Sequence, residues 1–305
     1  MDDAKVKRTA LMSAYLRAHH AVDGSAKIFD DFVAPRLLTE EDVAAFDHAM
    51  AAALPLVDPD LAALQPERAD AVAAMVRSYF PTSLFLSRSR YAEDELRASL
   101  PLGVTQYVIL GAGMDTFAFR NTEQNRQLRI FEIDHPATQS FKRKRIAELG
   151  WDVPSNLQWI PVDFTKQRLD AELAKARYDP QSPTFFSWLG VVHYLPRDAV
   201  FQTLRTIAEI SPAGSTIVFD YWDEDAFNPG KAAHRVNVMQ AMLRKAGEPM
   251  VTGFKPSALA AELDSVGLRL AEHLGPPDIQ HRYFQDRADG YYAYEHAYFV
   301  KAAVK

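Results

Sequence analysis

The sequence predicts an α/β fold: a doubly wound, mostly parallel, Rossmann-like sheet with an N-terminal helical cap and a lid insertion. Three observations favour it. The first hundred residues carry apolar side chains at helical spacing. From Gln106 onward, short apolar runs alternate with helical patterns, which is typical of parallel β-α-β units. The first of these runs ends in the turn Gly111-Ala112-Gly113, and a glycine-rich turn is common after the first strand of such sheets.

Three apolar stripes predict the N-terminal helices. In the range 11–22, apolar residues stand at 11, 14, 15, 18 and 22. Thr39 begins a pattern that resembles a capping box, and the helix it opens places apolar residues on one face through Leu54. Pro66 suits the first turn of a third helix, which runs toward Phe80. We expect residues 1–98 to form a helical cap packed on the core, and residues 99–305 to form the Rossmann-like domain.

The second part of the chain contains seven predicted strands and four predicted helices. The strands are 107–111, 129–134, 157–163, 184–192, 216–222, 268–274 and 296–302. The helices lie near 136–149, 197–209, 231–246 and 257–266, and Gly150 and Gly267 stand at C-cap positions. The segment 224–255 is rich in Met, Phe and His, and we expect it to be a lid that roofs the ligand site.

Composition and charge exclude several classes of function. The net charge of −6 disfavours nucleic acid as the main partner, and the basic run 142–145 is predicted to be a solvated helix face. The chain has no cysteine, so disulfides, thiolate metal sites and cysteine nucleophiles are excluded, and we expect no metal site. The N-terminus lacks the apolar core of a signal peptide, and no run approaches ~18 apolar residues. We therefore expect a cytoplasmic protein without a membrane partner.

Residues suited to a nucleoside follow the first three strands. The glycines of 111–113 let a ligand press against the backbone. About 20 residues further on, Asp134 ends the second strand, where a carboxylate can accept hydrogen bonds from a ribose diol. Asp163 and Phe164 end the third strand, where the acid can meet the exocyclic amine of adenine and the ring can lie beside the base. Because carboxyl ends of parallel strands share one edge, these side chains together predict a nucleoside site.

The glycine turn discriminates between nucleoside cofactors. A dinucleotide site would carry a third glycine, so that a pyrophosphate can reach a helix N-terminus. Here the stretch continues Met114-Asp115-Thr116: the third glycine is missing, and Asp115 would repel a pyrophosphate. This disfavours an NAD-binding oxidoreductase. The turn better suits a zwitterion, such as the amino-acid end of S-adenosylmethionine.

Two stretches carry a family resemblance. "QYVILGAGMDTFAFR" followed by "FEIDHPATQSFKRKRI" closely resembles the leucine carboxyl methyltransferase family of S-adenosylmethionine-dependent methyltransferases, and the resemblance covers roughly Tyr79 to Leu204. That family includes eukaryotic protein-phosphatase methyltransferases and bacterial enzymes, some of which methylate carboxyl groups of polyketides and other natural products. The resemblance implies that S-adenosyl-L-methionine is the cofactor and that 99–305 is the catalytic domain.

The resemblance also implies roles for single residues. Arg88, in "FLSRSRYAEDEL", matches an arginine that grips the cofactor carboxylate, a bidentate task suited to guanidinium. The Gly111-Ala112-Gly113 turn would lie against the methionine part, Asp134 would bind the ribose, and Asp163-Phe164 would flank adenine. Lys27, in "VDGSAK", matches an N-terminal lysine of some members once a gap is allowed.

One position departs from the family pattern. Many relatives have an acid in the fourth-strand motif E-G-V-x-x-Y-L, and Leu189 stands where that acid would be. Either a cofactor contact is lost or the pocket is shaped for another substrate, and a protein-phosphatase-type substrate is disfavoured. His193 and Tyr194 follow this strand, where methyltransferases of this class bring substrate to the cofactor, and they are the candidate catalytic residues.

The predicted activity is an O-methyltransferase that esterifies a carboxyl group of a small organic acid, a polyketide-type secondary metabolite. A carboxylate, with a pKa of ~4, is ionised at neutral pH and needs no general base. The alternative acceptor is a phenolic hydroxyl with a pKa of ~10, for which His193 is the nearest candidate base. A non-enzyme alternative, invited by Leu189, is an inactive cofactor-binding regulatory protein.

Overall fold

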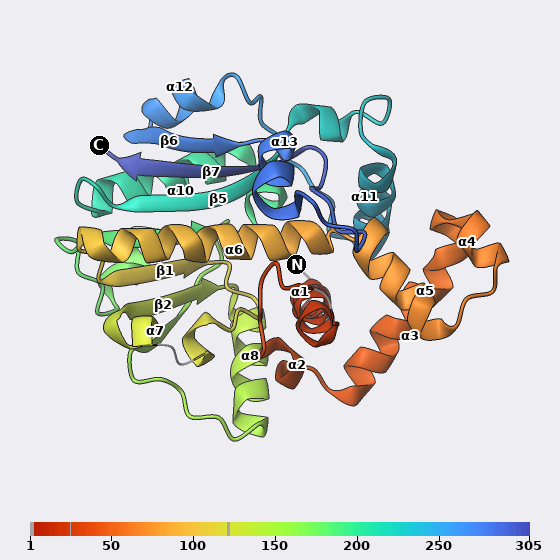
Figure 1. The fold of residues 1–305 in the computed structure, drawn as a ribbon. Helices are drawn as coiled ribbons and strands as arrows, with labels where there is room; N and C mark the ends of the chain where they lie inside the picture. Colours follow the sequence, from red (N-terminus) through yellow and green to blue (C-terminus); the bar gives the residue numbers. More distant parts are fainter. Residues whose placement is uncertain (1–2, 25, 121–122) are drawn as a thin grey trace.

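The computed structural model describes residues 3–24, 26–120 and 123–305, and these form a seven-stranded sheet with helices on both faces (Figure 1). The strands are β1 (Gln106–Leu110), β2 (Arg129–Asp134), β3 (Leu157–Pro161), β4 (Thr184–Trp188), β5 (Thr216–Trp222), β6 (Leu268–Leu274) and β7 (Ala297–Val304). Their order is β3-β2-β1-β4-β5-β7-β6. Strands β1 to β5 are parallel, and β7 is antiparallel to both β5 and β6. The predicted doubly wound, mostly parallel sheet is confirmed.

The strand order reverses between β1 and β4, which pair in parallel from Gln106↔Thr184 onward. The chain runs from β1 outward to β3, then returns to β4 on the other side of β1. All residues of β1, β4 and β5 are buried, which explains why they read as continuous apolar runs. In such a sheet the crevice outside the carboxyl ends of the two switch strands is where ligands bind.

Alternate residues of β1 serve two cores, one on each face of the sheet. Tyr107 and Ile109 belong to the core that includes helix α6 (Thr82–Ser99). Val108 and Leu110 belong to the core covered by α9 (Leu169–Ala174), α10 (Arg197–Ile210) and α12 (Leu259–Asp264). The remaining helices beyond β1 are α7 (Glu123–Gln127), α8 (Pro136–Glu148), α11 (His234–Ala246) and α13 (Pro276–Ile279).

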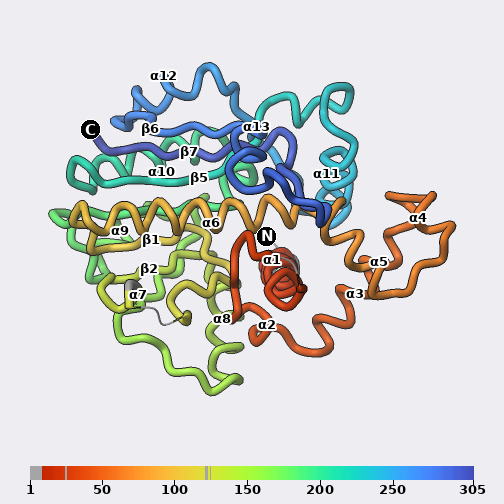
Figure 2. Tube along the Cα trace, viewed as in Figure 1, coloured from red at the N-terminus to blue at the C-terminus, as the bar shows by residue number. Residues whose placement is uncertain are grey.

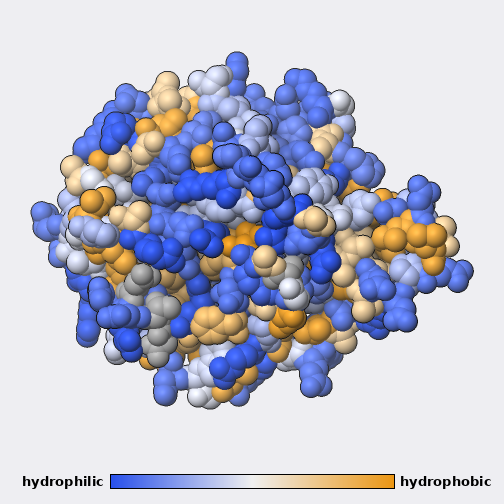
Figure 3. Space-filling model, viewed as in Figure 1, coloured by the Kyte–Doolittle hydropathy of each residue, from blue (hydrophilic) through white to orange (hydrophobic). Residues whose placement is uncertain are grey.

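The N-terminal helices are α1 (Asp3–Val22), α2 (Ala34–Leu37), α3 (Glu40–Val57), α4 (Pro59–Ala63) and α5 (Arg68–Ala74), and α5 continues into a π-helical turn over Met75–Tyr79. The predicted capping box is present: Asp42 N–H donates to Thr39 Oγ1 and Thr39 N–H to Asp42 Oδ2, each at 3.0 Å. The part formed by α3 to α5 projects from the rest of the molecule (Figure 2). Apolar residues gather there (Figure 3), and Leu56 and Leu64 are exposed. The division at residue 98 stays a prediction.

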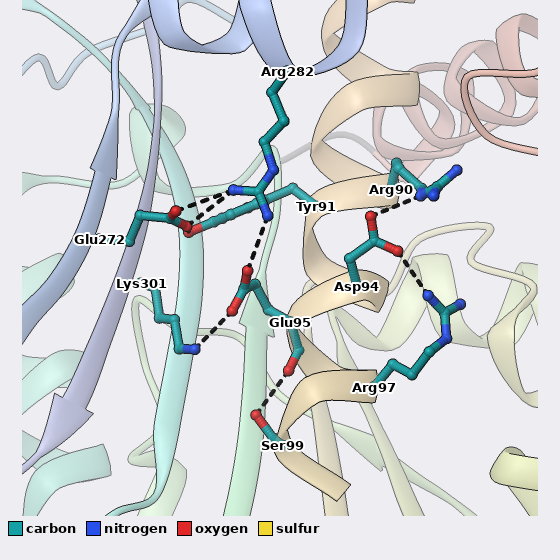
Figure 4. Close-up of polar contacts among 9 residues, drawn as sticks. All are labelled: Arg90, Tyr91, Asp94, Glu95, Arg97, Ser99, Glu272, Arg282 and Lys301. Atoms are coloured by element: carbon teal, nitrogen blue, oxygen red, sulfur yellow. Dashed lines mark hydrogen bonds and ion pairs between the residues drawn. The ribbon is translucent and has the colours of Figure 1, made fainter.

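Ion pairs tie α6 to the antiparallel edge of the sheet (Figure 4). Glu95 on α6 pairs with Lys301 on β7 at 2.7 Å and with Arg282 at 3.3 Å, and Arg282 also pairs with Glu272 on β6 at 3.1 Å. Such partly exposed pairs contribute little individually, but as a network they fix the position of the helix. Arg88, two turns earlier on the same helix, is therefore presented to the sheet by a fixed scaffold.

One strand boundary differs from its prediction by more than two residues. The sequence predicts that the fourth apolar run is a strand through residue 192, but β4 ends at Trp188. Gly190 has φ +71°, a conformation that strands exclude, and Val192–Tyr194 form a 3₁₀ turn. The apolar residues beyond Trp188 therefore lie at the carboxyl end of the sheet rather than inside it.

Candidate active site

The glycine turn after β1 packs directly against the loop that follows β4. The N–H groups of Gly111 and Ala112 both donate to the Ile133 carbonyl, at 2.7 and 3.1 Å, which holds the turn over the end of β2. Gly111 has φ +69°, and a Cβ there would lie 2.3 Å from Val191 Cγ2. Only glycine satisfies both conditions. The turn thus presents bare backbone at the switch point of the sheet.

Asp134 ends β2 beside this turn. One of its carboxylate oxygens accepts the N–H of Gly113, and the other accepts the N–H of His135 at 2.6 Å. Burial raises the pKa of Asp134, and the two backbone N–H donors oppose that rise. Asp134 is only partly buried, so part of it stays exposed at this edge of the sheet. The acid predicted to bind ribose therefore lies against the glycine turn, although it stands 21 residues beyond Gly113 in the sequence.

Asp163 and Phe164 follow β3 at the same edge. Asp163 accepts a hydrogen bond from the Thr165 hydroxyl at 2.6 Å and pairs with Lys166 at 2.9 Å. Partial burial raises the pKa of Asp163, but these donors outweigh it and lower the pKa to about 2. His135, the residue after Asp134, lies 3.9 Å from the Asp163 carboxylate. The Val162 N–H, one residue before Asp163, donates to the Asp134 carbonyl at 2.8 Å, so the two predicted nucleoside acids stand at adjacent strand ends.

Arg88, on α6, contacts Asp220 within β5 and lies against Gly190 in the loop after β4. Its Nη1 donates to Asp220 Oδ2 at 3.0 Å, and its guanidinium lies 4.3 Å from the Phe85 ring centre. A Cβ on Gly190 would lie 2.4 Å from Arg88 Nη2, so the guanidinium covers the glycine backbone. Asp220 was not predicted as a site residue. Nothing local distinguishes it, because it stands 132 residues from its partner.

His193 and Tyr194 stand on the 3₁₀ turn after β4. The His193 ring is buried between Tyr194, at 4.2 Å between ring centres, and Trp222, at 6.2 Å. Burial lowers the pKa of His193 to about 4, so the imidazole is neutral at neutral pH. Its Nδ1 has no hydrogen-bond partner in the described part of the chain. Burial raises the pKa of the Tyr194 hydroxyl.

Lys27 lies at the end of α1. Its ammonium donates to the His20 carbonyl at 2.6 Å and to the Asp23 carbonyl, an arrangement that satisfies free carbonyls at a helix C-terminus. These contacts hold Lys27 at the C-terminal end of α1 rather than beside the strand-end residues. Its role in cofactor binding stays a prediction.

Another pair from the N-terminal region reaches the glycine turn. Arg17 on α1 donates to the Met114 carbonyl at 2.6 Å and to Asp31 at 2.8 Å, and Asp31 accepts the Thr116 hydroxyl at 2.6 Å. Burial raises the pKa of Asp31, but Arg17 and its other partners bring the pKa below its usual value. Sequence reasoning missed this link, because neither charge belongs to a motif. It holds α1 and the segment after it against residues 114–116.

Two cavities are lined by residues outside the predicted site. One, of about 290 Å³, is lined by Phe29, Glu93 and Arg120 among others, and one of about 440 Å³ runs along α10 beside Arg205. Neither is lined by a predicted site residue. In the described ranges we find no group of three or more side chains able to hold a metal ion. The same ranges contain no helix long and apolar enough to cross a bilayer.

The sheet order, the glycine turn and the acids after β2 and β3 define a class I S-adenosylmethionine-dependent methyltransferase fold. The family model described as leucine carboxyl methyltransferase matches residues 10–208. The chain belongs to this family, whose members use S-adenosylmethionine, and the predicted family and cofactor are confirmed. The match begins far before the motif-bearing stretch from Tyr79, so the N-terminal helices are part of the family's pattern.

Comparisons with individual proteins agree. YktD of Bacillus subtilis, which carries the name of an S-adenosyl-L-methionine-dependent methyltransferase, is 35% identical over 304 residues, 97% of each chain. The fold resembles a Thermobifida fusca protein described as a methyltransferase, with TM-score 0.53, 16% identity and coverage of 78% of this chain and 87% of that one. A Streptomyces avermitilis protein gives TM-score 0.52, 17% identity and coverage of 79% and 91%. At these identities the two structures support the fold alone.

Proposed function

We propose that this methyltransferase esterifies the carboxyl group of a small organic acid, of the polyketide-type secondary-metabolite class. The observation that carries the proposal is the state of His193. By its place in the chain it is the nearest candidate base, and its burial among aromatic rings lowers its pKa to about 4. A site whose nearest imidazole is so weak a base suits an acceptor that is already ionised.

The proposed cofactor site uses the strand-end residues. Asp134 would accept the ribose hydroxyls, and Asp163-Phe164 would flank adenine, in agreement with their adjacency. The bare backbone of 111–113 would lie against the methionine part, and Arg88 would bind its carboxylate. Lys27 is retained as a further proposed contact. When bound, S-adenosylmethionine supplies an electrophilic methyl group on a sulfonium.

The two acceptors make different demands on His193. A phenol has a pKa of ~10, so an imidazole whose pKa burial lowers to about 4 is a poor acceptor for its proton. A carboxylic acid has a pKa of ~4 and arrives as the anion. The remaining task is to orient one carboxylate oxygen and remove water from it, which the aromatic rings around His193, the half-buried Tyr194 and the buried Trp222, would favour.

The predicted lid segment, 224–255, is proposed to close the acceptor pocket. It contains α11, and the loop that follows α11 packs on the candidate catalytic turn: the N–H groups of Val251 and Thr252 donate to the His193 carbonyl at 2.8 and 3.2 Å. Glu248 also accepts a hydrogen bond from Thr9 on α1. Because one loop contacts both the N-terminal helix and the 3₁₀ turn, its position and that of His193 are coupled.

Single-turnover methyl transfer tests the proposal. The acceptors are aromatic acids that each carry a carboxyl and a phenolic hydroxyl, and NMR locates the methyl group in the product. A methyl ester supports the proposal. An aryl methyl ether overturns it and favours the phenolic O-methyltransferase.

The inactive regulatory protein remains the alternative outside catalysis, since Leu189 leaves position 189 without an acid. Its signature is tight cofactor binding in calorimetry together with no methyl transfer to any acid of the panel or to aliphatic acids assayed beside it. That result would overturn the proposed activity while leaving the cofactor site intact.

A further inference from the structure

We propose that Asp220 is a positioning residue: it holds Arg88 in the orientation that binds the cofactor carboxylate, and it ties that arginine to the end of β4. The inference rests on the proposed role of Arg88. No motif marks Asp220, and the residues around it on β5 are apolar and aromatic. A carboxylate in the middle of a buried strand is costly unless charged partners and hydrogen bonds offset its desolvation.

The direction of the Asp220 side chain follows from the strand. Val218 and Trp222, two residues to either side, both belong to the core on the α6 face of the sheet. Because side chains alternate along a strand, Asp220 points to that face as well. Its side chain is 1% exposed. It therefore lies beneath α6, where Arg88 descends to the sheet.

Both oxygens of Asp220 are used, each on a different element. Oδ1 accepts the Gly190 N–H at 2.6 Å, and Oδ2 accepts Arg88 Nη1 at 3.0 Å. Gly190 is the residue at which the chain turns away after β4, with φ +71°. One carboxylate thus joins β5, the turn after β4 and helix α6. It lies two positions before Trp222, whose ring contacts that of His193.

Arg88 is constrained on three sides by this arrangement. Phe85 covers one side of the guanidinium, the Gly190 backbone approaches closely enough to exclude a Cβ, and Asp220 takes Nη1. A guanidinium has five N–H donors in a planar fork, and the contact with Asp220 uses only one of its nitrogens. No described residue accepts a hydrogen bond from Nη2 or Nε, so that edge can receive a second carboxylate in the bidentate manner that arginine favours.

The position that departs from the family motif, Leu189, lies directly beside the residue that Asp220 binds. Leu189, beside Gly190, offers no charge to Arg88, whereas Asp220 contacts both Arg88 and the Gly190 N–H. The acid that orients the arginine is thus supplied by β5, not by the motif after β4. Position 189 is apolar and packs against the core that α6 covers.

Calorimetry on the full chain with two ligands tests the inference. S-adenosylhomocysteine carries the amino-acid carboxylate, and 5′-methylthioadenosine lacks it. For Arg88→Met we expect affinity for S-adenosylhomocysteine to fall about 30-fold, within the range for a charged hydrogen bond, while affinity for methylthioadenosine changes less than twofold. For Asp220→Asn we expect about a 10-fold loss, again confined to S-adenosylhomocysteine. The double variant should bind no more weakly than Arg88→Met alone, because both changes remove one interaction.

Asp94→Asn is the matched control, since Asp94 lies on the outer side of α6 and pairs only with exposed arginines in Figure 4. It should leave both affinities unchanged. Equal loss of both ligands in Asp220→Asn, or no loss of either, overturns the positioning role. If Arg88→Met does not distinguish the two ligands, the proposed cofactor contact itself is wrong.

A charge-retaining variant covers the case in which Asp220→Asn does not fold. Asp220→Glu keeps the ion pair but moves the carboxylate by one methylene, so Arg88 must shift. We expect it to weaken S-adenosylhomocysteine binding by several-fold and to leave methylthioadenosine binding unchanged. Unchanged binding of both ligands by this variant overturns the inference.

Discussion

Substituting Gly111 by alanine should destabilise the protein by about 2–5 kcal/mol, through two separable contributions. Its φ of +69° costs an L-residue about 1–2 kcal/mol. The new Cβ would lie 2.3 Å from Val191 Cγ2, a contact that only movement can relieve, and overpacking of this kind costs typically about 1–3 kcal/mol. Urea unfolding of the parent and variant gives the difference directly.

Two further variants separate the contributions. Gly150 has a similar φ of +65°, and a Cβ added there would have no heavy atom within 4 Å, so Gly150→Ala should cost only the conformational part. In a Val191→Ala background the clash is removed, and adding Gly111→Ala should then cost about 1–2 kcal/mol. A loss of stability in Gly111→Ala no larger than that in Gly150→Ala, or no recovery of stability in the Val191→Ala background, would contradict the steric contribution.

Three other outcomes can be measured. Asp134→Ala should weaken binding of S-adenosylhomocysteine by about 1–3 kcal/mol in calorimetry, because the ribose loses a charged acceptor; equal affinity in a folded variant would contradict the assignment. Lys142→Met should lower the free energy of unfolding by about 3–5 kcal/mol in urea, since Glu132, 2.5 Å away and equally buried, loses its cation. Adding Glu132→Leu to the same chain should restore most of the lost stability. Burial lowers the pKa of His193 to about 4, below its value of 6.5 in the unfolded chain. The contribution of His193 to the free energy of unfolding is therefore fully present above pH 6.5 and falls by about 3 kcal/mol as the pH drops toward 4. Thermal unfolding of His193→Gln should show a smaller fall over the same pH range.

The sheet was predictable because its central strands are buried on both faces. Such strands are continuous apolar runs bounded by turn residues, and β1, β2 and β5 lie within a residue of their predicted limits. The exception is informative. The run that contains β4 stays apolar past Trp188, and Gly190 ends the strand through its backbone conformation rather than through polarity.

Helices were predicted less completely. Within the predicted helical cap, α2, α4 and α6 were not predicted as separate helices, and beyond β1 the helices α7, α9 and α13 were not predicted. Apart from α6, these helices are short, so they span too few turns for a periodic pattern to develop. The last predicted N-terminal helix begins at Arg68, not Pro66, and changes to π-helical geometry from Met75.

In the site, local motifs were visible and long-range ion pairs were not. Asp134 and Asp163 follow strands in a fixed order after the glycine turn, which is why sequence alone could find them. The role of Asp220 is visible only in the structure, where α6 places Arg88 Nη1 3.0 Å from its carboxylate. Lys142 shows the same limit: it was predicted on a solvated helix face, but it is 1% exposed and paired with Glu132. A run of charged residues in the sequence does not show which of them pairs with a buried residue.

The central claim, methyl transfer to a carboxylate without a general base, is tested most directly by the pH dependence of the single-turnover rate. The measurement uses saturating cofactor and the acid that gives the best yield, from about pH 6 to 9. We expect a nearly flat profile, since the acceptor has finished ionising by ~5, and an appreciable rate for His193→Gln. A rate that rises steadily with pH, together with a 10²–10⁴-fold loss in His193→Gln that shrinks at high pH, would contradict it.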